Sequence, residues 1–518
     1  MQILFVLRHS GNLRLFGSTI RELARRNHEV RLVFTDPSDR ALEAMTRGVL
    51  DELTAEENIS TRTWTSSPSP RTTVRDPRIT LHWWQDYLRY LEPAFADAPK
   101  LRDRAAANLS PQIRAASGIL AQSPELLAVV RRALAVTERA LVEPTTAAQS
   151  LLADEPVDLV VVSPLIGRSR KQLDIARAAR ARGAPVAFCC ASWDNLTTSG
   201  LIHADLDAVM VWNQAQRNEA VSLHGVPVER VVVTGAPAYD VWFESMPTHS
   251  RAEWCTEVGL DAAHPYLLYV CSSRFVAGDE VGYISRWVGG LRTAADPEVR
   301  DVRVLVRPHP QNVLDTARLT ALDGVSVHPQ PPELPLGEEA RARYVNAIHH
   351  SAAVVGVNTS AMIESAILGR GVHVHLTKRY RQTQAGTLHF RHLLAVGGGL
   401  LKATASLAEH HAGLCAALRG DDAEATAKRA QAFLHGFVRP AGLDRPATPL
   451  LARALEDVAA SMGKDRAALA ITDPFGVGPA AAQVCDALLR LAGDTGRGGR
   501  RGDEDPSLAA RRALLEGL

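Results

Sequence analysis

The sequence predicts an α/β protein built from two doubly wound parallel sheets. Short apolar runs of the kind that form strands buried on both faces recur along the chain, beginning with residues 3–7. Most of them lead through a polar turn into apolar residues at helical spacing, which is the pattern of β-loop-α-β units with right-handed crossovers. Because 518 residues exceed what one core normally supports, we expect more than one domain.

The first series of these units occupies the N-terminal half. We expect strands over 3–7, 30–34, 159–162, 185–190, 208–211 and 231–233, with helices over 16–26, 172–182 and 213–224. Residues 53–152 depart from this rhythm, with several helical patterns and the aromatic residues Trp83, Trp84, Tyr87 and Tyr90. We interpret them as a helical insertion into a domain over 1–245. The aromatic cluster is read as the anchor that packs the insertion onto the sheet, with an acceptor-binding platform as the alternative.

A polar, turn-rich connection over 246–257 precedes the second series. Its strands are expected over 266–271, 302–306, 325–328 and 354–357, with helices over 282–294, 344–350 and 362–368. We assign this series to a second domain over 258–440, followed by C-terminal helices over 441–492. The end of the chain, 493–518, lacks apolar periodicity and is expected to be disordered. Two doubly wound Rossmann-type domains facing across a cleft, with a helical insertion and C-terminal helices, describe a GT-B-like fold.

Composition narrows the function classes. Apolar residues make up 46% and charged residues 22%, as in ordinary globular proteins, and the net charge of +1 argues against nucleic acid as a partner. The six cysteines show no CxxC spacing, which favours reduced thiols in a cytoplasmic protein. No stretch approaches the roughly 20 apolar residues of a membrane span. We therefore expect a cytoplasmic protein, and leave open peripheral association with the inner face of the membrane.

Two segments of the second domain predict a binding site for a nucleotide. VRVLVRPHP (302–310) places Arg307 and His309 at the carboxyl end of a strand, where open α/β sheets bind ligands. VVGVNTSAMIESAILGRGV (354–372) passes from a strand through a polar turn into a helix that begins near Glu364. Backbone N–H groups in such a turn bind phosphate, and the acid can take the hydroxyls of a ribose. We therefore expect a pocket for a nucleoside mono- or diphosphate.

Each of these residues also has a purely structural interpretation. The two prolines can hold His309 at the strand end, and Glu364 can serve the helix dipole. The polar turn can cap the helix that follows it. A third loop after a strand carries the same two interpretations, phosphate contact or capping, and consists of Ser272, Ser273 and Arg274.

Further motifs give the chain a resemblance to a known group of enzymes. The strings are SWDNLTTSG (192–200), VWNQ (211–214), LHGVP (223–227) and VTGAPAY (233–239), together with RPHP and NTSAMIESAILGR in the second domain. Their order resembles bacterial surface-carbohydrate transferases of the CDP-glycerol glycerophosphotransferase and capsule glycosyltransferase type. The second-domain strings are similar, more distantly, to the non-hydrolysing UDP-N-acetylglucosamine 2-epimerases. The resemblance covers roughly 1–44 and 157–394 and leaves out the insertion and the C-terminal helices.

The resemblance implies roles for individual residues. His309 and Arg307 would support the donor phosphate, Glu364 would bind the ribose, and the phosphate would be lined by Asn358, Thr359 and Ser360. An inverting transferase needs a base for the acceptor hydroxyl, and His9 and Asp194 are the candidates. Structural alternatives exist for both, a turn histidine and an Asx-turn or N-cap residue, and a retaining mechanism would need no base.

Other sequence strings give weaker evidence for function. The two DxD strings, 205–207 and 503–505, do not follow a strand, so we expect no essential metal. No Walker sequence occurs, and GVGPAA (476–481) lacks a preceding strand, which argues against oxidoreductase cofactors and P-loop kinases. In QAGTLHF (384–390), the residues Gly386, Thr387 and His389 either close over the donor or form a tight turn, and we favour the turn.

The sequence thus predicts a metal-independent glycosyltransferase of GT-B type without a cofactor. It would move a glycosyl or polyol-phosphate group from a nucleotide-activated donor to a hydroxyl acceptor, such as a glycan, a lipid-linked or a small molecule, in surface polysaccharide or glycoconjugate biosynthesis. One alternative is an enzyme like the UDP-sugar 2-epimerases, and another is a non-catalytic scaffold that binds a nucleotide-sugar. The nucleotide base, the transferred group and the stereochemistry stay open.

Overall fold

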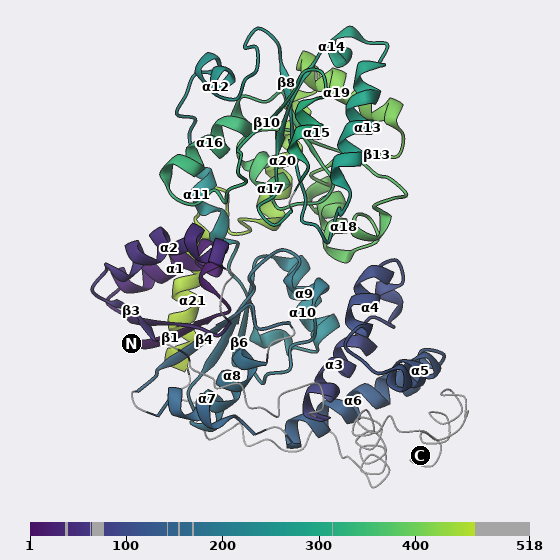
Figure 1. The fold of residues 1–518 in the computed structure, drawn as a ribbon. Coiled ribbons are helices and arrows are strands. Elements are labelled where there is room, and N and C mark those ends of the chain that lie inside the picture. Colours follow the sequence, from purple (N-terminus) through teal and green to yellow (C-terminus); the bar gives the residue numbers. More distant parts are fainter. Residues whose placement is uncertain are drawn as a thin grey trace.

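The chain folds into two lobes, each built around a parallel sheet (Figure 1). The computed structural model describes residues 1–36, 40–62, 64, 77–141, 143–153, 156–167, 170–312 and 314–461. The predicted tail, GVGPAA (476–481) and DED (503–505) lie outside these residues. In the described part of the chain, no helix has both the length and the apolarity required to cross a membrane.

The N-terminal lobe contains a seven-stranded sheet of order β3-β2-β1-β4-β5-β6-β7. Its strands are β1 (Gln2–Leu7), β2 (Glu29–Phe34), β3 (Ile59–Arg62), β4 (Leu159–Ser163), β5 (Val186–Cys189), β6 (Ala208–Val211) and β7 (Val231–Val233). The helices of this lobe are α1 (Leu13–Arg25), α2 (Arg40–Thr54), α8 (Lys171–Ala181), α9 (Asn195–Thr198), α10 (Gln214–His224) and α11 (Asp240–Phe243), with 3-10 turns η1 (Ser10–Asn12), η3 (Val228–Arg230) and η4 (Pro237–Tyr239).

The C-terminal lobe contains a six-stranded sheet of order β10-β9-β8-β11-β12-β13. Its strands are β8 (Tyr266–Val270), β9 (Arg303–Arg307), β10 (Val325–Val327), β11 (Ala353–Gly356), β12 (Val372–His375) and β13 (Lys402–Thr404). Around it lie α12 (Arg251–Glu257), α13 (Glu280–Arg292), α14 (Pro297–Arg300), α15 (Thr316–Thr320), α16 (Glu338–His349), α17 (Ala361–Ile367), α18 (Leu388–Ala395), α19 (Leu407–Arg419) and α20 (Ala423–Phe437), with η5 (Arg381–Thr383) and η6 (Val396–Gly398).

Side chains of the central strands alternate between two cores, as the two-residue period of a strand requires. In β1, Leu4 and Val6 join one apolar cluster, whereas Ile3, Phe5 and Leu7 join another on the opposite face. The strand β8 divides its residues between two clusters of the C-terminal lobe in the same way. These continuous apolar runs are buried on both faces, and the predicted fold class, two doubly wound sheets with helices on both faces, is confirmed.

The inserted helices form a small core of their own. They are α3 (Pro77–Arg89), α4 (Pro99–Ala106), α5 (Pro111–Leu120), α6 (Pro124–Leu141) and α7 (Thr146–Leu151), and η2 (Pro93–Phe95) precedes α4. Proline suits a first helical position because its missing N–H would have no partner there. Trp84 and Tyr87 pack against α5 and α6, and the Trp84 indole donates to Ser117 Oγ at 2.9 Å. Trp84 and Tyr87 therefore hold the insertion together rather than anchor it, whereas the Tyr90 hydroxyl donates to the Ser199 carbonyl of the N-terminal lobe.

Three strands were not predicted. The edge strand β3 lies inside the predicted insertion, and β12 and β13 lie in the second domain, beyond the last strand expected there. Only Ile59 is buried in β3 and no residue is fully buried in β13, so neither edge strand shows an apolar run. The last described helix, α21 (Ala447–Ser461), returns to the N-terminal lobe, where Leu451, Ala452 and Leu455 join the core beneath β1.

A buried ion pair fixes the segment through which the chain returns from the C-terminal lobe to the N-terminal lobe. Asp240 and Arg439 are 7% and 5% exposed, and the guanidinium donates to Asp240 Oδ1 at 2.7 and 3.0 Å. The same carboxylate accepts the backbone N–H groups of Ala447 at 3.0 Å and Thr448 at 2.7 Å, at the start of α21. One carboxylate therefore joins the end of the N-terminal lobe to the segment that leaves the C-terminal lobe.

We predict that Asp240→Ala lowers the free energy of unfolding by about 3–5 kcal/mol, because it leaves a buried guanidinium without its counter-charge. Denaturation by urea, followed by circular dichroism, measures the change. Asp421→Ala removes an exposed carboxyl at the end of α19 and should shift the free energy by less than about 0.5 kcal/mol. Equal stability of the two variants would contradict this role of Asp240.

Candidate active site between the two lobes

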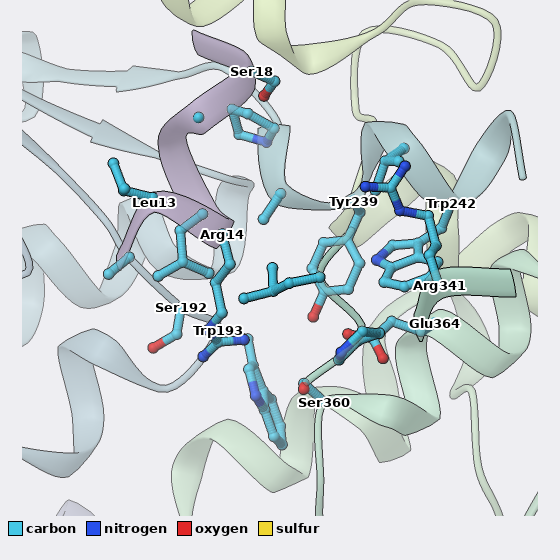
Figure 2. Close-up of a pocket in the computed structure, with 18 of the residues that line it drawn as sticks. Leu13, Arg14, Ser18, Ser192, Trp193, Tyr239, Trp242, Arg341, Ser360 and Glu364 are labelled. Atoms are coloured by element: carbon cyan, nitrogen blue, oxygen red, sulfur yellow. The ribbon is translucent and has the colours of Figure 1, made fainter. Parts of the chain in front are cut away.

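The carboxyl ends of both sheets face a cavity of about 880 Å³ between the lobes (Figure 2). The N-terminal lobe contributes residues of α1, the loop after β5 and η4, including Arg14, Asp194 and Tyr239. The C-terminal lobe contributes loops after β8, β9 and β11 and part of α16. An adjoining recess of about 190 Å³ lies beside it and shares Arg14, His309, Thr359, Ser360 and Glu364.

Arg307, at the end of β9, is a buried cation that forms no ion pair with any of the residues that the structure describes. It is 6% exposed, its Cζ lies 4.6 Å from the centre of the Tyr344 ring, and Nη2 donates to the Glu333 carbonyl at 3.5 Å. Within the described residues, Nη1 is buried and has no hydrogen-bond partner. Burial lowers the pKa of Arg307, although the guanidinium stays charged. A desolvated N–H group of this kind gains most from an anionic oxygen.

Glu364 lies on α17 beside Arg307 and is hydrogen-bonded to Tyr344. The Tyr344 hydroxyl donates a short hydrogen bond to Glu364 Oε2. Burial raises the pKa of Glu364, while the hydrogen bond and the charges of Arg14 and Arg307 act in the opposite direction. Tyr344 thus touches Arg307 with its ring and Glu364 with its hydroxyl, and sets the distance between them.

His309 follows β9 and lines both the cavity and the recess. Burial, and then the charge of Arg14, lower the pKa of His309 to about 4, so its imidazole is neutral at physiological pH. Its Nδ1 lies 3.0 Å from the backbone nitrogen of Gln311 and accepts that N–H. The neutral ring therefore carries its proton on Nε2 and can donate one hydrogen bond to a ligand oxygen.

The residues of the polar turn after β11, Asn358, Thr359 and Ser360, have different roles. Asn358 is buried, its N–H donates to Ser272 Oγ at 3.3 Å, and its side-chain amide donates to the Thr383 carbonyl. Thr359 and Ser360 line both the cavity and the recess. The Ser360 hydroxyl makes no capping hydrogen bond to α17, so the capping interpretation does not account for it. Asn358 also borders the cavity, but its side chain holds the turn in place.

Of the loop after β8, only Ser273 and Val276 reach the cavity. Ser272 is fully buried, and its N–H donates to Glu280 Oε2 at 2.8 Å, a carboxyl whose pKa burial raises to about 8. Arg274 is exposed and does not line the cavity. The expectation of phosphate contact is therefore corrected for both residues. Ser272 makes structural hydrogen bonds, and Arg274 is exposed to solvent outside the cavity.

The two candidate bases occupy different places. Asp194 lines the cavity, where Oδ1 accepts from Ser192 Oγ at 2.6 Å and Oδ2 from Thr198 Oγ1 at 3.4 Å. His9 lines the recess, close to the Arg307 side of the site, rather than the main cavity. Of the two, Asp194 is therefore the one that lines the main cavity.

Several residues of the site were not predicted. Arg14, on the first turn of α1, projects into the middle of the cavity, and Figure 2 shows it facing Tyr239, Glu364 and Arg341 from the other walls. The charge of Arg14 acts on the pKa values of both His309 and Glu364. Its place shortly after the first strand was the available signal, since that position lies at the ligand edge of the sheet.

His389 joins the two lobes at the cavity wall. Its Nδ1 lies 3.1 Å from Thr197 Oγ1, and its ring packs edge-on against Trp193 at 5.0 Å between centres. Burial lowers the pKa of His389 to about 4. Gly386 sits in a tight turn, where an added Cβ would lie 2.4 Å from the Asp97 carbonyl oxygen. The segment thus forms a tight turn, as favoured, and also closes one wall of the cavity.

Groups with metal-ligand chemistry lie elsewhere. Of the described residues, His82, Asp86 and His203 form one such group in and beside the insertion, and Asp296, Glu298 and Cys415 form another. His203 lies 2.9 Å from Asp86 through Nε2 and 2.9 Å from Glu138 through Nδ1, and these carboxylates raise its pKa to about 9. The contacts of both ring nitrogens with carboxylates favour the protonated imidazole. In the DLD string, Asp205 and Asp207 pair with Arg180 and Arg230.

Comparisons with known proteins bear on the fold. No protein-family model and no curated protein sequence matches the chain. The solved S. aureus MnaA-UDP complex is similar with a TM-score of 0.50 and 12% identity, over 89% of this chain and 97% of that one. A Neisseria meningitidis UDP-GlcNAc 2-epimerase bound to UDP-GlcNAc (0.49, 12% identity, 88% and 100%) and a Rickettsia africae ESF-5 glycosyltransferase (0.49, 9%, 90% and 99%) are also similar. At these identities the likeness shows the GT-B-like fold and nothing finer.

We predict that the imidazole of His309 titrates near pH 4 in the free protein, as followed by NMR of ring protons assigned through His309→Gln. Because its pKa lies below the 6.5 of the unfolded chain, the native state binds fewer protons, and stability falls as pH drops from about 6.5 to about 4. Arg14→Met should raise the midpoint, since it removes a nearby positive charge. A midpoint near 6.5 in the free protein would contradict the burial of this ring.

Proposed function

We propose that the protein is a GT-B-type transferase that moves a glycosyl or polyol-phosphate group from a nucleotide-activated donor to a hydroxyl acceptor. One observation carries the proposal: Arg307 is a buried cation that forms no ion pair with any described residue, and it lines the recess beside the cavity between the lobes. A site of this kind favours an anionic ligand. The C-terminal lobe would bind the donor and the N-terminal lobe the acceptor.

The arrangement of the residues supports a nucleotide phosphate as that anion. Arg307 Nη1 and the Nε2 proton of His309 provide donors for phosphate oxygens, and Ser360 borders both spaces. Glu364 lies one helical turn further on, where its carboxyl can accept the hydroxyls of a ribose. A cavity of about 880 Å³ leaves room for a second substrate beside a nucleotide.

In the proposed reaction, the acceptor oxygen bonds to the transferred group as the bond between that group and the donor phosphate oxygen breaks. Asp194 takes the proton of the acceptor hydroxyl from the side of the N-terminal lobe. The negative charge that develops on the leaving phosphate is stabilised by Arg307, Arg14 and the hydrogen bond from His309. These groups carry the charge without a metal, so we propose that transfer is metal-independent.

A second candidate is an epimerase that acts on a UDP-sugar. The distant similarity of the RPHP and NTSAMIESAILGR strings to the non-hydrolysing UDP-N-acetylglucosamine 2-epimerases favours it. An epimerase changes the donor sugar without any acceptor, whereas a transferase releases the nucleotide only when it has a group to move to an acceptor. Incubation with the nucleotide-sugar alone, followed by chromatography of the products, therefore distinguishes the two.

We predict that a nucleoside diphosphate or monophosphate raises the melting temperature, and that His309→Ala lowers turnover about 10²–10³-fold, the usual loss when one preorganised hydrogen-bond donor is removed. Thermal shift with CDP, CMP, UDP and other nucleotides identifies the base. Coupled assays of nucleotide release then measure turnover with the matching donor.

Arg286→Ala provides the control for these variants, since Arg286 is exposed on α13 and does not line the cavity. It should melt, bind and turn over like the unchanged protein. If no nucleotide raises the melting temperature, or if His309→Ala keeps full turnover, the proposed function is wrong.

A further inference from the structure

The helical insertion reaches across to the opposite lobe. Residues 93–106, which comprise η2 and α4 and are called the bridging segment below, contact the C-terminal lobe near η5 and α18 (Figure 1). Asp97 Oδ2 accepts from Arg391 Nη2 at 2.9 Å, and Asp97 Oδ1 from Arg381 Nη2 at 3.4 Å. Two arginines of one lobe therefore pair with one carboxylate of the other.

Two cationic side chains of the bridging segment also contact Phe275 of the C-terminal lobe. Lys100 Nζ lies 4.7 Å and Arg104 Cζ 4.5 Å from the centre of the Phe275 ring. The Lys100 ammonium also donates a short hydrogen bond to the Phe275 carbonyl. Two cations of α4 thus hold one aromatic ring, in contacts that are electrostatic and depend on the ring face.

Phe275 belongs to the loop after β8 that forms part of the cavity wall. Its neighbours Ser273 and Val276 line the cavity, and the N–H groups of Val276 and Ala277 both donate to the Ser273 carbonyl at 3.0 Å. The same loop supports the turn after β11, because Ser272 Oγ accepts from the Asn358 N–H. A displacement of Phe275 would therefore move Ser273 and Val276 in the cavity wall and the turn after β11, on the donor side of the proposed site.

The other end of the bridge is fixed to the N-terminal lobe. Arg89, fully buried at the end of α3, donates to the carbonyl oxygens of Gly200 at 2.5 Å and of Leu196. The Tyr90 hydroxyl donates to the Ser199 carbonyl. Asp86 accepts the Leu201 N–H at 2.8 Å as well as the proton of His203 Nε2. The end of α3, which directly precedes the bridging segment, is therefore anchored to the loop that follows Asp194.

We propose that the bridging segment sets the position of the 272–277 loop against the N-terminal lobe in the free protein, with Lys100, Arg104 and Phe275 as positioning residues. This side of the cleft is then closed by the chain itself, and the donor meets a preformed wall. The consequence for donor binding rests on the proposed function, whereas the ordering of the loop does not.

Hydrogen exchange on the full-length protein without ligand tests the proposal. The double variant Lys100→Met, Arg104→Met should speed exchange of the Val276 and Ala277 amides about 5- to 30-fold, the effect of losing two cation–π contacts. Phe275→Ala should do the same, and Phe275→Trp, which keeps an aromatic face, should stay close to the unchanged protein. Arg102→Met, on the same helix without a contact to Phe275, is the matched control and should leave these amides unaffected.

Unchanged exchange in the double variant, or an equal increase in Arg102→Met, would overturn the proposal. With the nucleotide identified by thermal shift, the double variant should also raise the dissociation constant of that nucleotide about 5- to 30-fold and KM more than it lowers kcat. If the double variant exchanges faster but the protein binds no nucleotide, the proposed function is refuted and the positioning role of the bridging segment stands. Retained nucleotide affinity with unchanged exchange would refute the bridge alone.

Discussion

The site depends on the charge of one buried guanidinium. Arg307 is surrounded by the Tyr344 ring and a carbonyl oxygen, and Glu364, the acid beside it, is hydrogen-bonded to Tyr344. The Arg14 charge comes from the opposite lobe, and His309 is neutral because its pKa is low. Within the described residues, Glu333 and Glu364 act on the Arg307 charge only from a distance, and neither forms an ion pair with it. An anion that enters regains the electrostatic stabilisation that burial removed.

The two lobes keep this arrangement through contacts on opposite sides of the cleft. On one side, Asp240 binds Arg439 and the start of α21, where the chain crosses back. On the other side, the bridging segment holds Phe275 and pairs Asp97 with two arginines. Both connections are ionic and both involve residues distant in sequence. They connect the two lobes around the cavity that the carboxyl ends of both sheets face.

The fold was predictable where burial on both faces leaves a continuous apolar run, as in β1 and β8. It was not predictable for β3 and β13, edge strands with mixed burial, or for α21, whose apolar stripe does not say which lobe it covers. At the site, Arg307, His309, Ser360 and Glu364 could be brought together from the sequence because each follows a strand of one sheet. Arg14 was missed because its role arises only when two lobes face each other. Ser272 was misjudged because its partner, Glu280, is a buried acid later in the chain.

A crystal structure of the protein with a bound nucleoside diphosphate tests the central claim most directly. The phosphate oxygens should lie within hydrogen-bond distance of Arg307 Nη1 and His309 Nε2, with ribose hydroxyls at Glu364. A nucleotide bound away from the gap between the lobes, or bound there with its phosphates turned from Arg307, would contradict the account.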